Sequence, residues 1–439
     1  MKFLFAATPV PGHVNPLLAI VRMVKKRGGE ALFATARHLM PTVEAAGARA
    51  VKLEGDADID FREIEKVYPE WTDLSPQERL PFGLKKAILG PMEAQAATLR
   101  NLIASDSPDI IVADSLFCGT TPLFLDRSRR RPPIVACGIS ILMLERADGA
   151  PGLTGLPPAR DTADRARYAA MRADADAFMA PVELLADAKL AAMGLPGLPH
   201  RFGPSRVLLA DAYLQPTVPA FEYDFGPLPP TVHFIGALPP PPPPEATRPD
   251  WWGELDGARK VVLVTQGTAA NFDFGNLVEP TLAALAGRDD VLVVVTTGGR
   301  PVENVRGPLP ANARVAVFLD YEALLPKLDL LVTNGGYGTV SLALRAGVPI
   351  VAAGRTEDKA EVGARVAWSG VGIELPTDTP SIEEVRNAVA RVWADPRFRQ
   401  RARMMAADFA TFDAEREIFR VVAGLVIHER RSAEALLAS

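Results

Sequence analysis

A single histidine near the start of the chain stands in a position suited to a general base. His13 lies in the stretch TPVPGHVNPLLAI, directly after the apolar run FLFAA, where a strand is expected to pass into a helix. Asp114 ends a second apolar run, in PDIIVADS. Histidine is the usual general base near neutral pH, and a neighbouring carboxylate can fix its tautomer and stabilise the imidazolium. From spacing alone, this interpretation and one in which both residues only cap turns are equally favoured.

A glycine-rich turn in the second half of the chain suits a phosphate. In VTNGGYGTVSLALRAGVP, a strand runs into Gly335 and Gly336, and a helix is expected to open through Gly338 and Thr339. Backbone N–H groups at such a helix start favour a phosphate or diphosphate. The spacing matches neither the dinucleotide fingerprint nor the P-loop. The stretch TQGT, residues 265–268, supplies further small polar groups at another predicted strand end.

Two other chemical patterns are discounted. The acidic stretch DADID at 56–60 and the sequence DAD at 174–176 have the carboxylate spacing that metal-dependent sugar transferases use. One lies in an acidic loop and the other in an alanine-rich helical stretch, so a solvated surface is favoured and no metal site is predicted. No G-x-S-x-G motif appears in the sequence, which argues against a serine hydrolase.

The elements that must position these residues alternate between strand and helix. Apolar strands are expected at 2–7, 30–35, 108–115 and 132–140, and helices at 15–28, with Asn15 as N-cap, and at 91–105. This order predicts a parallel, doubly wound α/β sheet. Ligands bind beyond the carboxyl ends of such strands, which is where His13 and Asp114 are placed. Longer, less regular segments at 56–90 and 141–190 are expected at the rim.

The second half repeats the pattern, with strands expected at 260–268, 290–299, 313–320, 328–336 and 348–354. Six consecutive prolines, residues 239–244, favour an extended linker. The sequence therefore predicts two Rossmann-like domains facing across a cleft. The expected boundaries are 1–215 for the first domain, 216–255 for the linker, 256–400 for the second domain and 401–439 for helices that return to the first.

The composition limits the class of protein. The chain has 439 residues, a net charge of −5 and two cysteines, Cys118 and Cys137. Nucleic acid is not expected as a partner, and the basic run RSRRRPP at 127–133 is interpreted as a solvated loop. Two cysteines form no disulfide framework, so buried free thiols and a cytoplasmic location are expected. Neither a signal peptide nor a membrane-spanning run is predicted.

The pairing of PGHVNP with VTNGGYGT and ALRAGVPIV resembles family 1 glycosyltransferases, the UDP-glycosyltransferase superfamily with the GT-B fold. Bacterial members that act on natural products and phenolics look most similar. The resemblance implies inverting, metal-independent transfer of a sugar from a nucleotide diphosphate, such as a UDP- or TDP-sugar, to an acceptor hydroxyl. It implies that His13 is the base and Asp114 its partner. No cofactor beyond the nucleotide-sugar co-substrate is implied.

The resemblance also implies a donor site. Phe318 would stack on the base, and the adjacent backbone at Leu319 would read the base edge. Sugar hydroxyls would be held by Asp358. The diphosphate and the rest of the donor would contact Gly12, Thr268, Asn334, Gly335, Gly336, Gly338, Thr339 and Lys359.

Three positions depart from the family pattern. Asn334 replaces a common histidine, Leu342 replaces a ribose-binding glutamate, and Lys359 replaces the glutamine of an Asp-Gln pair. Lys359 would favour an acidic sugar or pair with Glu357 or Glu361. These departures affect the choice of donor more than the type of reaction.

The acceptor is expected to be an apolar small molecule, with Trp71, Phe82, Phe117 and Met143 as candidate contacts from the irregular segments and the strand ends. A phenolic, flavonoid or polyketide-like acceptor fits this content. No stable membrane insertion is expected, and the protein is expected to be a monomer or a weak dimer. The alternatives are a GT-B nucleotide-sugar epimerase and a binding protein that has lost turnover.

Overall fold

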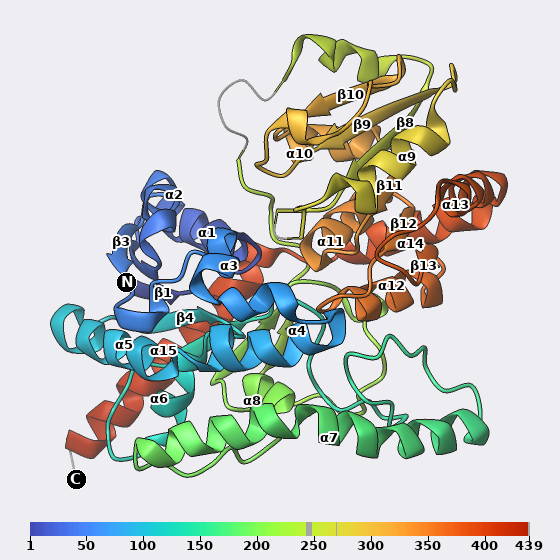
Figure 1. Ribbon diagram of the computed structural model, residues 1–439. Coiled ribbons are helices and arrows are strands. Elements are labelled where there is room, and N and C mark those ends of the chain that lie inside the picture. The colour runs from blue at the N-terminus through green and yellow to red at the C-terminus, as the bar shows by residue number, and fades with distance from the viewer. Residues whose placement is uncertain (243–247, 269, 438–439) are drawn as a thin grey trace.

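The structure is a computed structural model that describes residues 1–242, 248–268 and 270–437, and the chain forms two parallel sheets covered by helices (Figure 1). The inner strands of both sheets are almost wholly buried because helices lie on both faces, whereas the edge strands are half-buried. In β1 (Lys2–Ala6), Phe3 and Phe5 face one core cluster while Leu4 and Ala6 face another. This two-sided burial explains the continuous apolar runs in the sequence.

The first sheet has seven parallel strands in the order β3-β2-β1-β4-β5-β6-β7. After β1 these are β2 (Glu30–Thr35), β3 (Arg49–Lys52), β4 (Ile110–Asp114), β5 (Ile134–Cys137), β6 (Ala212–Gln215) and β7 (Val232–Phe234). The chain builds outward from β1 to β3, then returns and continues from β4 on the other side. The strand order therefore reverses between β1 and β4, and such a switch point is where ligands of these sheets bind.

The helices of this half are α1 (Pro11–Lys26), α2 (Met40–Ala45), α3 (Ile64–Val67), α4 (Pro76–Gly83), α5 (Met92–Asp106), α6 (Thr121–Leu125), α7 (Thr162–Ala192) and α8 (Phe202–Leu208). The 31-residue helix α7 makes much of the segment 141–190 more regular than expected, and it includes the alanine-rich stretch around 174–176 that was expected to be helical. Only the part before α7 is a loop. Both cysteines are free and buried, and burial raises the pKa of the Cys118 thiol to about 11.

The second sheet has six parallel strands in the order β10-β9-β8-β11-β12-β13. They are β8 (Lys260–Thr265), β9 (Val291–Thr296), β10 (Ala313–Ala316), β11 (Leu330–Thr333), β12 (Ile350–Ala353) and β13 (Gly372–Leu375). Here the order reverses between β8 and β11. The prediction of two Rossmann-like α/β domains is confirmed by these two sheets.

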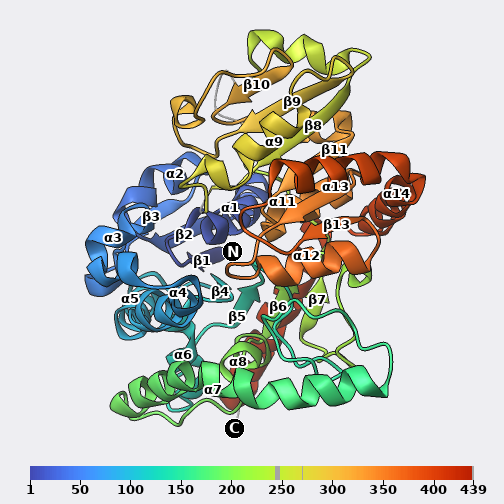
Figure 2. The same ribbon diagram turned by 45° about the vertical axis from the view of Figure 1, so that its right-hand side comes forward.

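The helices of the second half are α9 (Val278–Leu285), α10 (Tyr321–Leu324), α11 (Tyr337–Arg345), α12 (Lys359–Trp368), α13 (Ile382–Ala394), α14 (Pro396–Ala410) and α15 (Ala414–Leu437). The last helix, α15, lies among the elements of the first half in both views (Figures 1 and 2). Its residues Ile418, Val422 and Val426 share a core cluster with Phe3 and Leu17. The chain thus starts and ends in the same domain.

Two details differ from the expected elements. Helix α1 begins at Pro11, four residues before the expected N-cap Asn15, because a proline fits the first turn of a helix, where its missing N–H is not needed. Strand β7 adds to the first sheet from within 216–255, the range expected to be linker. Of the proline run 239–244, residues 243 and 244 lie outside the described residues.

Candidate active site

His13 and Asp114 meet at the switch point of the first sheet. His13 follows β1 and lies in the first turn of α1, while Asp114 is the last residue of β4. His13 Nδ1 lies 3.1 Å from Asp114 Oδ1. The histidine side chain is 15% exposed and the aspartate side chain is fully buried. A ligand can therefore reach the imidazole, whereas the carboxylate lies behind it.

The carboxylate of Asp114 is held by three donors. Its Oδ2 accepts the backbone N–H of Thr8 at 2.5 Å, and its Oδ1 accepts the N–H of Leu116 at 2.8 Å in addition to His13. An ionised carboxylate only accepts hydrogen bonds, so Nδ1 of His13 must donate. This leaves Nε2 of a neutral imidazole unprotonated, which is the state that a general base needs.

The glycine turn lies at the switch point of the second sheet. β11 pairs with β8 with Thr333 opposite Thr265, so the turn after β11 lies beside the TQGT stretch after β8. Asn334 is buried, and its Nδ2 donates to the carbonyl of Gln266 at 2.8 Å, which joins the two strand ends. At Gly335 the backbone has φ of +88°, a conformation that favours glycine.

Helix α11 begins directly after this turn, with Gly336 as its N-cap residue. The first-turn N–H groups of a helix have no intrahelical partners, so those of Tyr337, Gly338 and Thr339 are free to bind an anion. Gly338 is exposed and Thr339 is half-buried, so a ligand can approach this turn. Leu342, one turn further on, packs against the core of the second domain. Its apolar character is explained by that packing.

Two other donor candidates follow other strands of the second sheet. Phe318 follows β10 and is 44% exposed, whereas the next side chain, Leu319, is buried. Thr268 is exposed after β8. Gly12 lies in the first domain, in the first turn of α1 beside His13, where a Cβ would meet no neighbour within 4 Å among the described residues.

Asp358 and Lys359 lie at the start of α12, and Asp358 contacts the first domain. Ser140 Oγ donates a hydrogen bond to Asp358 Oδ2. Ser140 follows β5, where Cys137 pairs with Asp114 of β4. The residue expected to hold the sugar is thus connected to the sheet edge that carries His13. Burial raises the pKa of the Asp358 carboxyl.

The buried ammonium of Lys359 pairs with Glu357, one of the partners expected from the sequence. Glu361, the other expected partner, instead binds Arg365. Glu357 is 62% exposed and adopts φ of +56°, which is uncommon for a residue with a side chain. Lys359 therefore presents a cation whose charge is already balanced by this neighbour.

Of the acceptor candidates, Phe117 is corrected by the structure. It is fully buried in a core cluster with Leu4 and Leu99, so its ring is a packing element and is unavailable to a ligand. Trp71 and Phe82 are half-buried and pack edge to face with centroids 6.0 Å apart. Met143 is half-buried in the loop after β5.

Sequence reasoning missed Ser140 and Tyr337 because serine and tyrosine carry no pattern that marks a contact across domains.

No three His, Cys, Asp or Glu side chains among the described residues are grouped so as to hold a metal ion. No helix within the described ranges is long and apolar enough to cross a membrane. A hollow of about 340 Å³ lined by Ile103, Arg130 and Val426 lies elsewhere on the first domain and includes none of the candidate site residues.

Comparisons with known proteins bear on the family and the fold of the chain. Residues 279–425 match the family model of the erythromycin biosynthesis protein CIII-like C-terminal domain. The chain is 38% identical to 4'-demethylrebeccamycin synthase of Lentzea aerocolonigenes over 97% of this chain and 99% of that protein. It is 34% identical to UDP-glycosyltransferase 2 of Phaeomoniella chlamydospora, over 94% of this chain and 93% of that protein.

A solved structure supports the fold. The structure of spinosyn rhamnosyltransferase SpnG complexed with thymidine diphosphate matches with a TM-score of 0.69 at 18% identity, covering 96% of this chain and all of that chain. At this identity the match shows the two-domain architecture alone.

Proposed function

The chain belongs to the family 1 glycosyltransferases of natural-product type, and we propose that it moves a sugar with inversion from a UDP- or TDP-sugar to a hydroxyl of an apolar small molecule. His13 is the general base and Asp114 its partner in this proposal. The observation that carries it is the 3.1 Å contact of His13 Nδ1 with a buried, triply hydrogen-bonded Asp114 at a switch point. The proposal also requires a binding site for the diphosphate, and the glycine-rich turn before α11 is suited to it.

The reaction proposed is a single displacement. Nε2 of His13 takes the proton of the acceptor hydroxyl while that oxygen bonds to the anomeric carbon. The bond from the anomeric carbon to the diphosphate oxygen breaks, and its electron pair leaves on the diphosphate. Asp114 stabilises the imidazolium that forms.

Negative charge grows on the departing diphosphate, so donors aimed at that charge lower the barrier. The first-turn N–H groups of α11 are the proposed donors, with Thr268 and the Asn334 amide nearby in the two adjacent strand ends. The N–H groups of α11 act through backbone position and the helix dipole. They therefore do not require the histidine that the family commonly has at residue 334.

Inversion is supported by the position of the carboxylate. A retaining double displacement would need a nucleophile that reaches the anomeric carbon. Asp114 is fully buried behind His13, and both its oxygens already accept hydrogen bonds. The site thus offers a base but no carboxylate nucleophile from this pair.

The donor and acceptor classes are proposed from the relatives and from the site. One relative is named a UDP-glycosyltransferase and a fold neighbour was solved with thymidine diphosphate, so both nucleotides are candidates. The rebeccamycin synthase relative favours a natural-product acceptor. Because Glu357 balances Lys359, we propose a neutral sugar over an acidic one.

The test is an assay with UDP- and TDP-sugars in parallel, with and without a panel of phenolic, flavonoid and polyketide-like acceptors. The proposal predicts acceptor-dependent release of the nucleoside diphosphate and a glycoside whose anomeric configuration, read by NMR, is opposite to that of the donor. Epimerisation of the donor without acceptor would instead indicate an epimerase. A donor that raises the melting temperature without any product would indicate a binding protein.

A further inference from the structure

Three charged side chains form a buried group where the two domains meet. Arg365 lies on α12 with its side chain 1% exposed, and its partners Glu222 and Glu361 are each 2% exposed. Arg365 Nη2 lies 2.9 Å from Glu222 Oε2, and Nη1 lies 2.8 Å from Glu361 Oε2. We call these three residues the interdomain ion cluster. Burying a charge costs free energy that its ion-pair partner offsets. Removing one partner therefore leaves an uncompensated buried charge and strongly destabilises the contact.

Glu222 joins the cluster to both candidate substrate regions. It lies between β6 and β7, and its Oε1 accepts the backbone N–H of Leu142 at 3.1 Å and the hydroxyl of Tyr337 at 3.3 Å. Leu142 belongs to the loop after β5, beside Ser140. Tyr337 is the first residue of α11, at the glycine turn. One carboxylate therefore contacts the loop of the first domain, the proposed diphosphate turn and α12.

Glu361 makes a second connection to the same loop. Its Oε1 accepts the backbone N–H groups of Thr154 and Gly155, each at 3.0 Å. The backbones approach closely there, because a Cβ on Gly155 would lie 2.9 Å from the carbonyl oxygen of Ala360. In both ribbon views the loop between β5 and α7 lies against α12 (Figures 1 and 2).

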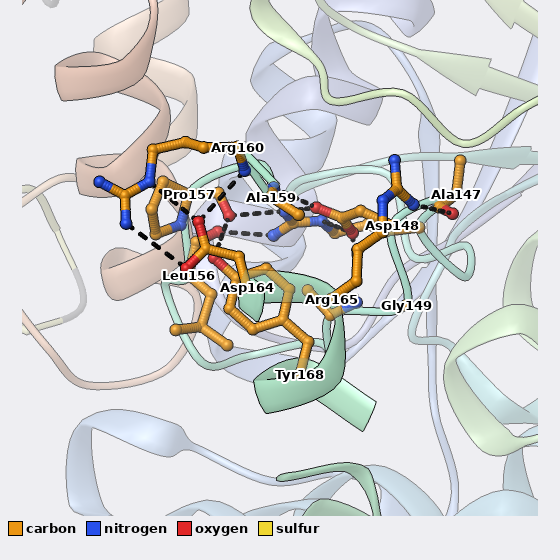
Figure 3. Close-up of polar contacts among 12 residues, drawn as sticks. Ala147, Asp148, Gly149, Leu156, Pro157, Ala159, Arg160, Asp164, Arg165 and Tyr168 are labelled. Carbon is orange, nitrogen blue, oxygen red and sulfur yellow. Dashed lines mark hydrogen bonds and ion pairs between the residues drawn. The ribbon is translucent and has the colours of Figure 1, made fainter. Parts of the chain in front are cut away.

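This loop has a fixed conformation of its own (Figure 3). Asp148 accepts the N–H of Ala159, and Tyr168 Oη donates to the carbonyl of Pro157 at 2.8 Å. The buried guanidinium of Arg146 pairs with Asp148 and also donates to Pro157. Burial opposes the charge on Asp148, but hydrogen bonds from Arg146 and from backbone N–H groups outweigh it and lower the pKa of that carboxyl.

An aromatic ring links the loop to the cluster. The guanidinium carbon of Arg146 lies 4.3 Å from the ring centroid of Tyr223, and that of Arg365 lies 4.1 Å from the same centroid. The ring therefore contacts one cation from the loop and one from α12. Cation–π contacts are stronger when the cation and the ring are desolvated, and Arg146, Arg365 and Tyr223 are all buried.

We propose that Arg365 is a positioning residue for sugar transfer, which fixes α12 and its first residues against the acceptor side of the first domain. The inference rests on the proposed function. Asp358, expected to hold the sugar, immediately precedes α12 and reaches Ser140, so any rotation of α12 moves the sugar relative to His13. Transfer requires the reacting atoms to lie close together, and small misplacement lowers the rate greatly. Arg365 itself contacts neither substrate in this proposal.

The first test compares Arg365→Met with wild type in three measurements. These are kcat for transfer, the Kd of thymidine diphosphate or UDP, and the distance distribution between spin labels on Glu44→Cys and Asp289→Cys, one exposed site in each domain. We expect kcat to fall about 100-fold, Kd to change less than threefold and the distance distribution to broaden. A folded Arg365→Met protein with wild-type kcat and a wild-type distance distribution would overturn the inference.

A milder pair of variants decides the question if Arg365→Met does not fold. Gly155 has φ of +67° and meets Ala360, whereas Gly149 of the same loop has φ of +79° and no neighbour within 4 Å of a Cβ. Both alanine variants carry the same backbone strain, but only Gly155→Ala pushes against α12. We expect Gly155→Ala to lower kcat at least fivefold below Gly149→Ala. Equal kcat values would contradict the inference.

The spin-label distances separate this inference from the proposed function. If the wild type transfers no sugar at all, the proposed function fails while the distances still report whether the cluster fixes the domains. If transfer is normal in wild type and the distances and kcat of the variants are unchanged, the positioning inference alone fails.

Discussion

The two switch points of the molecule are built in different ways. At the first, the reactive groups are the side chains of His13 and Asp114, and backbone N–H groups of Thr8 and Leu116 hold the carboxylate that fixes the histidine tautomer. At the second, the candidate binding groups are backbone N–H groups, which the turn at Gly335 and the start of α11 position. A substitution at the first switch point removes a chemical group, whereas many side-chain changes around the second leave the N–H groups in place.

The three departures from the family pattern that the resemblance implies lie in one region. Asn334, Leu342 and Lys359 all lie around the second switch point, and each has a structural role there in strand joining, core packing or ion pairing. Under the proposed function, the first switch point sets the reaction and the second sets the donor. The predictions below test this division.

The largest effect is expected for His13→Ala, because general base catalysis contributes about 10²–10⁴-fold. We expect kcat to fall about a thousandfold, measured by acceptor-dependent release of the nucleoside diphosphate. His38→Ala is the matched control. His38 is similarly buried and faces Asp60 at 3.6 Å, outside the site, so its loss should leave kcat within about twofold. Comparable loss in both variants would contradict a special role for His13.

Asp114→Asn should have the next largest effect. In either orientation of the new side-chain amide, its NH₂ group takes the place of an oxygen that accepts hydrogen bonds. It would then face the N–H of Thr8 at one position, or the donors of His13 and Leu116 at the other. We expect kcat to fall on the order of a hundredfold because the wrong imidazole tautomer is favoured. The unfolding free energy should fall by about 1–3 kcal/mol from the unsatisfied donors. Unchanged kcat with the loss in stability would assign Asp114 a structural role only.

Phe318→Ala should act on donor binding and leave chemistry alone. Stacking of a base on an aromatic ring is worth about 1–3 kcal/mol, so the Kd of UDP or thymidine diphosphate should rise about tenfold. Val317→Ala is the control, because Val317 is the exposed neighbour at 38% against 44% for Phe318. If kcat at saturating donor fell while Kd stayed unchanged, Phe318 would affect the chemical step. That result would contradict the division of roles between the two switch points.

Lys359→Gln should have the smallest effect. The buried lysine is paired with Glu357, whose largely exposed carboxylate stays solvated by water when the lysine charge is removed. We expect the ratio of kcat/KM for UDP-glucose over UDP-glucuronic acid to change by less than about threefold. A large gain of the neutral donor over the acidic one in the variant would show that the lysine selects an acidic sugar in the wild type.

The sequence allowed good prediction wherever a local pattern determines the structure. Buried parallel strands read as continuous apolar runs, so the sequence predicts two parallel sheets and the strand ends that carry His13, Asp114 and Gly335, although short strands such as β6, β7 and β13 have no predicted counterpart. Phe117 was misplaced because an aromatic residue after a strand has the same local pattern whether it faces the core or a ligand. The start of α1 was placed late because Asn15 resembles an N-cap, although Pro11 already fits the first turn.

Contacts between distant segments were not predicted. Arg365 and Glu222 are 143 residues apart, and Ser140 and Asp358 are 218 residues apart. No spacing rule connects such pairs, since they meet only after two domains have packed together. Arginine and glutamate in a helix or loop are also usually solvated, so their burial cannot be inferred from their type.

The central claim is that Nε2 of His13 is the free base nitrogen, and the tautomer of this residue tests it most directly. The chain has five histidines, so ¹⁵N–¹H correlation spectra of the imidazole rings can be assigned, with His13→Ala identifying the signal of interest. At a pH where the ring is neutral, the account predicts a proton on Nδ1 and none on Nε2. A neutral His13 protonated on Nε2 would contradict it, because that nitrogen could not accept the proton of an acceptor hydroxyl.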